Sequence, residues 1–143
     1  MIIKITESDA HKQLAFDIRT KVFVDEQNVP PEEELDEFDH DSETVHFTGY
    51  ENDKLIAASR LRFVEGYGKL ERICVLLEYR GNAHGKQLIL AMEDKIQQRQ
   101  LTKAKLNAQT HAVDFYKRLG YEVVSGEFMD AGIPHVTMVK ELV

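Results

Sequence analysis

The chain has 143 residues, of which 43% are hydrophobic and 30% are charged, and its formal net charge at pH 7 is −7. This balance is typical of one globular domain spanning residues 1–143 and excludes a disordered chain. No apolar run reaches the roughly 18 residues that a membrane-spanning helix needs, and no basic footprint points to nucleic acid, so we expect neither kind of partner.

The N-terminal residues predict a strand followed by a helix. Residues 1–5 are β-prone and are expected to form an edge strand. Ser8 can cap a helix, and the apolar side chains after it recur at four-residue steps. The predicted apolar stripe consists of Ala10, Leu14, Ile18 and Val22. The adjacent prolines at 30 and 31 are expected to end regular structure and to open a loop.

This predicted loop lies in a strongly acidic segment. Residues 22–53 contain twelve Asp and Glu side chains and no Lys or Arg, whereas the rest of the chain contains 18 basic and 13 acidic side chains. Such a division suggests two ligands of opposite charge, a cation at the acidic surface and an anion at the basic one. The alternative is an acidic loop that is simply solvated, and charge alone favours this alternative.

The remaining elements predict a mixed α/β (α+β) protein. Residues 45–50 and 55–64 flank the polar turn ENDK and predict a β-hairpin, and a third strand is expected over 70–77. A glycine turn then leads into a helix that is expected to end near Arg99. A short strand at KAKLNA, a compact helix that Gly120 ends, and a hairpin of 122–128 with 135–141 complete the chain.

The glycine turn, RGNAHGKQL, has the features of an anion site. The dinucleotide fingerprint is absent, and the P-loop pattern fails because three residues separate the glycines and Gln87 follows Lys86. What remains is a strand, Arg80, and the N-terminus of a helix, where unpaired N–H groups and the helix dipole attract anions. A lysine in the first helical turn is mildly unfavourable unless an anion lies beside it. The alternative is a plain strand-to-helix turn with a solvated lysine.

The turn also resembles the signature (Q/R)-x-x-G-x-(G/A) of the GNAT superfamily of acyl-coenzyme A-dependent N-acetyltransferases. Arg80 to Gly85 match it, except that Ala83 replaces the first signature glycine, and alanine fits there if its φ is negative. A second block, NAQTHAVDFYKRLGYEVV, is similar to a later pattern of the same superfamily. The blocks RTKVFVDEQNVP and GIPHVTM are similar to one bacterial branch of small GNAT proteins, so the resemblance covers nearly the whole chain.

The resemblance implies a mostly antiparallel central sheet flanked by helices, with acetyl-CoA as co-substrate. The acetyl group would pass directly from the thioester to an amine, in a ternary complex without a covalent acyl-enzyme. The residues expected to hold coenzyme A are Ile73, Cys74, Val75, Arg80, Gly81, Asn82, Ala83, His84, Gly85, Lys86, Gln109, Phe115 and Tyr116. A backbone N–H of the strand around Cys74 would polarise the thioester carbonyl.

The resemblance further implies a general acid and a general base. Tyr116 is expected to protonate the departing thiolate, because a phenol is protonated at neutral pH. Glu71 is the first candidate for the base and Glu26 the second, and Asp39, His46 and His135 are further candidates. The residues expected to bind the acceptor amine are Glu26, Asp39, His46 and His135. Each has a structural alternative: the acids as solvated or arginine-paired groups, and the histidines as caps or bridges between strands.

Cys74 and the N-terminus bear on the redox compartment. A single cysteine excludes an internal disulfide and a multi-cysteine metal site, and we expect no metal ion. In an apolar strand Cys74 fits a buried structural thiol better than a nucleophile. Because MIIKITESDAH lacks a long apolar core, we expect a cytoplasmic protein.

The competing hypotheses for the function are a non-catalytic acyl-CoA sensor and a partner-binding module. A homodimer formed through terminal strands stays open.

Overall fold

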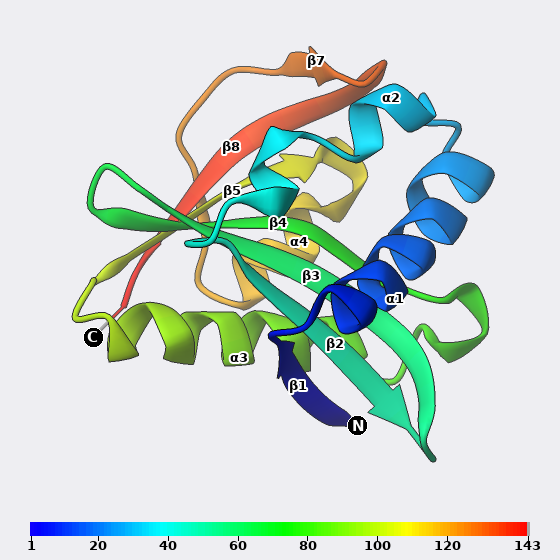
Figure 1. Ribbon diagram of the computed structural model, residues 1–143. Helices are drawn as coiled ribbons and strands as arrows, with labels where there is room; N and C mark the ends of the chain where they lie inside the picture. Colours follow the sequence, from blue (N-terminus) through cyan, green and yellow to red (C-terminus); the bar gives the residue numbers. More distant parts are fainter. Residues whose placement is uncertain (143) are drawn as a thin grey trace.

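The computed structural model describes residues 1–142 and has one mixed sheet with helices on both faces (Figure 1). The first half contains β1 (Ile2–Thr6), α1 (Asp9–Arg19), a π-helix (Thr20–Glu26), α2 (Pro31–Glu34), a 3₁₀ helix (Glu37–His40), β2 (Val45–Glu51), β3 (Lys54–Val64) and β4 (Tyr67–Val75). The second half contains a 3₁₀ turn (Leu77–Tyr79), α3 (His84–Gln98), β5 (Lys103–Gln109), a 3₁₀ turn (Thr110–Ala112), α4 (Val113–Arg118), β6 (Glu122–Val123), β7 (Phe128–Asp130) and β8 (Ile133–Glu141).

The strand order is β1-β2-β3-β4-β5-β8-β6, with β7 also paired to β8. All neighbours are antiparallel except β4 and β5, which are parallel. The predicted fold class is therefore confirmed. Because residues 1–142 build one continuous sheet, we propose that the chain is one domain. The strands β1 and β6 lie at the ends of the strand order, and the homodimer through terminal strands stays a prediction.

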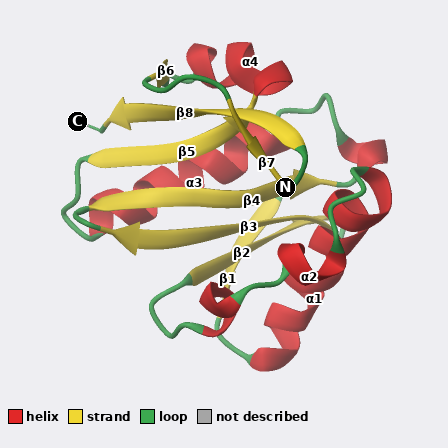
Figure 2. Cartoon of the chain, turned by 90° about the horizontal axis from the view of Figure 1, so that it is seen from above, coloured by secondary structure: helices red, strands yellow, loops and turns green. Residues whose placement is uncertain are grey.

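Two apolar layers hold the helices against the sheet (Figure 2). Side chains of successive strand residues point to opposite faces, so Ala57 packs in the layer under α3 and Ala58 in the layer under α1. The α3 layer is the larger one, and Leu88, Met92 and Ile96 are fully buried in it. Helices thus pack on both faces of the sheet.

The predicted stripe of α1 is wrong at its first two positions. Ser8 caps the helix as expected, accepting a hydrogen bond of 3.2 Å from the His11 backbone N–H. Ala10 and Leu14 are exposed, however. A four-residue step advances 400° around an α-helix, so such a stripe drifts away from one face. The buried residues are Ala15, Phe16, Ile18, Arg19 and Val22, which largely follow the three- and four-residue spacing of a helix packed on a sheet.

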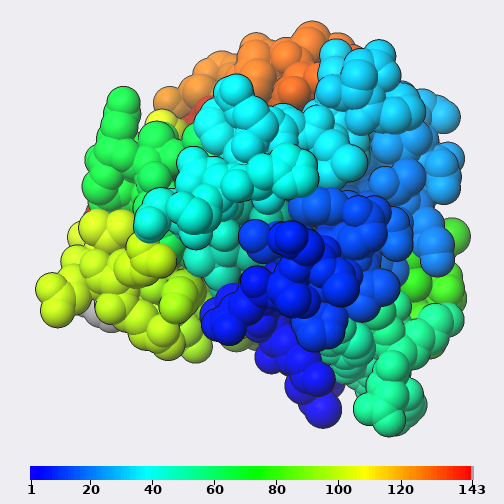
Figure 3. All heavy atoms as spheres, in the orientation of Figure 1, coloured from blue at the N-terminus to red at the C-terminus, as the bar shows by residue number. Residues whose placement is uncertain are grey.

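The acidic segment is not a free loop, which corrects a second prediction. Pro31 opens α2 instead of ending regular structure, because proline is tolerated in the first turn of a helix. Asp36 and Asp39 then form a capping box at the 3₁₀ helix. The Asp39 carboxylate accepts from the Asp36 backbone N–H, and the Asp36 carboxylate accepts from a backbone N–H of the first turn. Figure 3 shows this segment, in light blue to cyan, lying across the front of the molecule beside α1.

The remaining boundaries differ by a few residues. The β2–β3 hairpin is confirmed, whereas β4 begins and ends earlier than predicted. The last hairpin is more irregular than expected, because the predicted strand 122–128 divides into β6 and β7. Both segments pair with β8, the second through a tight turn at residues 131 and 132.

Candidate active site

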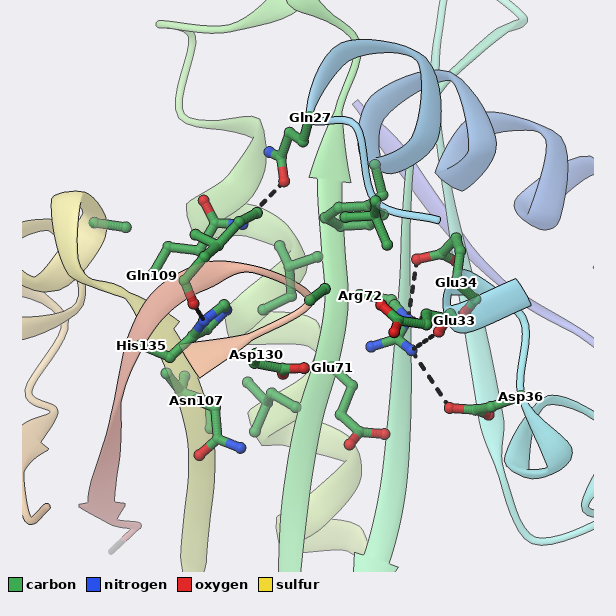
Figure 4. Close-up of a pocket in the computed structure, with 18 of the residues that line it drawn as sticks. Gln27, Glu33, Glu34, Asp36, Glu71, Arg72, Asn107, Gln109, Asp130 and His135 are labelled. Atoms are coloured by element: carbon green, nitrogen blue, oxygen red, sulfur yellow. Dashed lines mark hydrogen bonds and ion pairs between the residues drawn. The ribbon is translucent and has the colours of Figure 1, made fainter. Parts of the chain in front are cut away.

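A cavity of about 530 Å³ opens where β4 and β5 stop pairing (Figure 4). Their parallel register covers only residues 68–70 and 104–106. A bulge follows in β4, where Arg72 has φ +56° and the register with β3 shifts. Glu71 and Ile73 of β4, Asn107 and Gln109 of β5, α2, Tyr116 and the β7–β8 hairpin line the cavity.

The edge of β4 that faces this opening carries unpaired backbone groups. The Leu76 N–H donates to the Ile56 carbonyl on β3, at 2.8 Å, whereas the Val75 carbonyl accepts from Arg80 Nε on the other side, at 2.9 Å. Because successive residues of a strand point their backbone groups to opposite sides, those of Ile73 also face the opening. An extended amide chain could therefore pair there as an additional strand would. These are the predicted pantetheine-binding residues.

The glycine turn has the geometry of an anion site. The helix α3 begins at His84, and its first main-chain bond runs from the Gln87 N–H to the Ala83 carbonyl at 3.0 Å. The N–H groups of residues 84–86 therefore lack partners within the helix. The space before the turn is open, because a Cβ added to Gly81 would meet no atom within 4 Å. The turn thus fits a multiply charged anion.

The backbone conformation of Ala83 differs from the one expected. We expected alanine to fit if its φ were negative, but φ is +63° and ψ is 17°, the left-handed region. That conformation costs an alanine about 1–2 kcal/mol relative to the right-handed one. The turn therefore holds Ala83 in a conformation that favours glycine, at some cost in stability.

Arg80 and Glu26, two predicted site residues, bind one another. The terminal nitrogens of Arg80 donate to the two oxygens of Glu26 at 2.6 and 2.8 Å. Hydrogen bonding to Arg80 is the main reason why the pKa of Glu26 lies below its ordinary value. Glu26 lines a separate, smaller hollow of about 290 Å³ and does not line the 530 Å³ cavity. This position argues against Glu26 as a base or an acceptor ligand.

Tyr116 is placed as a proton donor would be. Its ring lines the cavity and packs edge-on against Phe115 and Tyr121, with centroids 5.1 and 6.0 Å away. Burial raises the pKa of its hydroxyl to about 12, which keeps the phenol protonated. Within residues 1–142 that hydroxyl has no hydrogen-bond partner, so it is free to donate to a ligand.

Glu71 lines the cavity but is neutralised by cations. Its oxygens accept from Arg60 at 2.6 Å and lie 3.1 Å from Lys69 and 3.5 Å from Arg62. Burial alone would raise the pKa of Glu71, but the charges of Arg60 and Lys69 outweigh burial and lower it. The structural alternative that the sequence left open is thus present, and a carboxylate so paired is a weak proton acceptor.

Asp39 and His46 lie in a buried ionic network, outside the lining of the cavity. The Asp39 carboxylate is fully buried and accepts from Arg19 at 2.7 and 3.0 Å and from Arg60 at 3.0 Å. His46 is fully buried and donates from Nε2 to the Asp39 carbonyl at 3.1 Å. Neither residue lines the cavity, so their predicted acceptor role is corrected to a structural one.

Burial also decides the state of Cys74. The residue is 4% exposed in the α1 layer, and burial raises the pKa of the thiol to about 12. A thiol in that environment stays protonated and does not act as a nucleophile. Its backbone groups point toward β3, where it pairs with Ala58, so Ile73 and Val75 on either side of it face the opening in its place.

Gln27 and His111, which the sequence did not indicate, lie at the cavity beside a predicted residue. Gln109, which was predicted, donates from Nε2 to Gln27 Oε1 at 2.9 Å and accepts from His111 Nε2 at 2.6 Å. This chain of side chains crosses the end of the opening between the π-helix and β5. Gln27 stands in the block VFVDEQNVP, which carried the resemblance, and only its place in that block could have indicated it.

The cavity is acidic, and three of its carboxylates have no cationic partner. The described lining contains six acidic side chains and two basic ones. Glu34, Asp36 and Glu71 pair with arginines. In residues 1–142, Glu32 and Glu33 on α2 and Asp130 on β7 form no ion pair or side-chain hydrogen bond. The site thus offers negative charge on the α2 side and on the hairpin side (Figure 4).

His135 is the one predicted acceptor residue that lines the cavity. Nδ1 lies 2.7 Å from the Ile133 carbonyl, and the ring stacks on Phe128 with centroids 6.1 Å apart. Across β5 and β8 it stands directly opposite Gln109.

The residues described here contain no group of three side chains that could hold a metal ion. None of their helices is both long enough and apolar enough to cross a membrane.

Comparisons with known proteins agree with this geometry. A family model described as acetyltransferase (GNAT) domain matches residues 6–142. The chain is 46% identical to YjcF of Bacillus subtilis, named an uncharacterized N-acetyltransferase, over 96% of this chain and 97% of that protein. An acyl-CoA N-acyltransferase from Pseudomonas aeruginosa has a TM-score of 0.87 and 27% identity, covering 97% of this chain and 98% of its own. An aminoglycoside 6'-N-acetyltransferase solved with coenzyme A has the same fold, with a TM-score of 0.76 and 18% identity over 100% of this chain and 98% of its own.

Proposed function

Since the chain belongs to the GNAT acetyltransferase family and is an N-acetyltransferase, we propose that it transfers the acetyl group of acetyl-CoA to a cationic primary amine. The observation that carries this proposal is the unpaired edge of β4 beside the glycine turn and the acidic cavity. One end of the site suits a pyrophosphate and the other suits an ammonium group.

The coenzyme A half of the proposal rests on the turn and on β4. The free N–H groups of residues 84–86, with Lys86 among them, are the groups that would hold the pyrophosphate. The main chain of Ile73 and Val75 would pair with the pantetheine amides. An aminoglycoside 6'-N-acetyltransferase of the same fold has been solved with coenzyme A, which supports a coenzyme A site in this fold.

The reaction that fits the site is direct attack of the amine on the thioester. The amine nitrogen forms a bond to the carbonyl carbon, and the carbon–sulfur bond breaks. A backbone N–H at the β4 opening would stabilise the developing oxyanion, an effect of a few kcal/mol. The Tyr116 hydroxyl would protonate the leaving thiolate and regain a proton from the attacking nitrogen.

The acceptor half rests on the unpaired carboxylates. Glu32, Glu33 and Asp130 surround the cavity without cationic partners, so an acceptor with positive charge would replace water around them. A solvated acidic rim would produce the same charge, and kinetics separate the two explanations. We expect 1,4-diaminobutane to have a higher kcat/KM than butylamine, because it carries a second charge.

The experiment is a calorimetric titration with acetyl-CoA followed by thiol-release assays on those two amines. Lys86→Ala should weaken acetyl-CoA binding, whereas Lys95→Ala in the last turn of the same helix should not. A double variant, Glu32→Gln with Glu33→Gln, should reduce the preference for the diamine. Glu37→Gln is the matched control, because this exposed acid of the same segment does not line the cavity. Absence of acetyl-CoA binding would refute the proposal.

The sensor hypothesis has a weaker basis. It needs a coenzyme A site without a proton donor or a path for the amine, yet Tyr116 is free to donate and the cavity opens beside it. Turnover of any amine in the same assay would eliminate it.

A further inference from the structure

The side chain of His135 is held in one tautomer by the turn that precedes it. Nδ1 lies 2.7 Å from the Ile133 carbonyl, and a carbonyl oxygen can only accept. Nδ1 must therefore carry the proton and donate it, which leaves a lone pair on Nε2. The residue is 8% exposed, so the imidazole is more than nine-tenths buried in this fixed orientation.

Nε2 is the ring nitrogen of His135 that remains for a ligand. Among residues 1–142, Nε2 has no hydrogen-bond partner, and it is not enclosed as Nδ1 of His46 and of His84 are. Because His135 lines the cavity, its open nitrogen is the one that a ligand meets (Figure 4). Stacking on Phe128, with an interplanar angle of 23°, keeps the ring from turning away.

The reaction needs a group that accepts a proton. An alkyl amine is mostly an ammonium ion at neutral pH and must lose a proton before it can attack. Glu71, the carboxylate nearest to the β4 bulge, is bound by Arg60 and Lys69, and Glu26 is bound by Arg80 outside the cavity. Neither can readily accept the proton, since each would give up an ion pair.

On the premise of the proposed function, we propose that Nε2 of His135 accepts the proton of the acceptor ammonium. The proton moves to Nε2, and the imidazolium keeps its Nδ1 hydrogen bond to Ile133. The neutral amine then forms the carbon–nitrogen bond as the carbon–sulfur bond breaks. The thiolate takes the Tyr116 proton, Tyr116 takes the second proton of the nitrogen, and His135 releases its proton to solvent. The products are the acetylated amine, free coenzyme A and one proton.

The test is the variant His135→Asn. Its side-chain amide can donate to the Ile133 carbonyl from the position of Nδ1, but it cannot accept a proton at neutral pH. We expect kcat for 1,4-diaminobutane at pH 7 to fall by about 10²- to 10⁴-fold. The acetyl-CoA dissociation constant and the urea midpoint should stay close to those of the unchanged chain. His11→Gln, an exposed histidine on α1, is the control.

Two further measurements separate a base from a packing residue. The loss in His135→Asn should shrink as the pH rises, because a growing fraction of the amine is already neutral. It should also nearly vanish for 2,2,2-trifluoroethylamine, which is uncharged at pH 7. An unchanged kcat in His135→Asn, or a loss that is equal for both amines and at every pH, would overturn the inference. If the unchanged chain binds acetyl-CoA but acetylates neither amine, the proposed function fails as well.

Discussion

The carboxylate of Glu26 and the guanidinium of Arg80 form a two-pronged ion pair that joins the end of the π-helix to the glycine turn, 54 residues further along the chain. Arg80 also donates from Nε to the Val75 carbonyl on the open edge of β4. The group predicted to bind a phosphate therefore already has an anionic partner, and an incoming pyrophosphate would compete with that partner.

Glu26→Gln should tighten acetyl-CoA binding. Removing the carboxylate frees Arg80, and we expect the dissociation constant to fall by about two- to fivefold, the range for a partly exposed ion pair. Calorimetry measures this change, with Asp25→Asn as the control at the neighbouring exposed acid. If Glu26 were the general base, kcat would instead fall by about 10²-fold or more.

Ala83→Gly should stabilise the protein. The left-handed φ of +63° strains an alanine but not a glycine, so we expect a gain of about 0.5–1 kcal/mol in the free energy of unfolding. The same substitution at Ala91, inside α3, should cost about 1 kcal/mol. Ala83→Val should destabilise the turn and weaken acetyl-CoA binding. Urea unfolding compares the three, and a loss of stability in Ala83→Gly would contradict the assigned backbone conformation.

Tyr116→Phe should lower kcat without changing acetyl-CoA affinity. The variant loses only the hydroxyl, whose pKa burial raises to about 12. Since water can also protonate a thiolate, we expect a moderate loss of about tenfold. Thiol release under saturating substrates measures it. Tyr50→Phe, on β2 and outside the cavity, should behave like the unchanged chain, and an unchanged kcat in Tyr116→Phe would remove Tyr116 from the mechanism.

Asp39→Asn should destabilise the fold and leave acceptor kinetics nearly intact. The substitution leaves Arg19 and Arg60 buried without their shared carboxylate, which should cost about 3–5 kcal/mol of unfolding free energy. Urea unfolding gives the cost, and KM for 1,4-diaminobutane in the folded variant tests the role. A raised KM with unchanged stability would restore the acceptor role that burial argues against.

Stability should decline on the acid side of about pH 4. The arginines around Asp39 and Glu71 lower the pKa of both carboxyls in the folded state, although burial opposes this. The unfolded chain therefore binds more protons near pH 4, so stability is fully present above the unfolded pKa values and is lost as the pH falls below them.

Glu34 opposes this trend, because burial raises its pKa and its contribution is lost as the pH rises. The pKa of Glu26 is lowered as well, so three lowered carboxyls against one raised carboxyl leave a net loss of stability in acid. Urea unfolding at pH 7, 5, 4 and 3 measures the slope, and Asp39→Asn should flatten it. Equal unfolding free energies at pH 5 and pH 3 would contradict the assignment.

Local patterns predicted most elements of the fold. Hydrophobic spacing and turn residues located the β2–β3 hairpin, α3 and the glycine turn, because each depends on neighbours within a few residues. The same reasoning failed for Leu14, which follows a four-residue repeat but is exposed. It also failed for Pro31, which opens a helix. In the first case a four-residue step drifts around the helix, and in the second proline is tolerated in the first helical turn.

Some features of the candidate site also follow from local sequence, and others depend on residues that are distant in the chain. The turn around Ala83 and the cavity position of Tyr116 follow from contiguous motifs. The partners of Glu71 and Asp39 come from Arg60 and Arg19, which are distant in sequence, and no spacing rule links them. A list of acidic residues therefore could not separate paired carboxylates from free ones.

The sequence by itself determined the family, the mixed sheet and the position of the glycine turn, because backbone conformation and motif spacing are local properties. Only the tertiary structure decided which charges are available. Folding buries Asp39 against Arg19 and ties Glu71 to Arg60 and Glu26 to Arg80. It also brings His135 to the cavity, where Nε2 has no hydrogen-bond partner among residues 1–142. The reason is physical: a charge acts on whatever lies within a few ångströms of it, and those neighbours come from strands and helices that the sequence keeps apart.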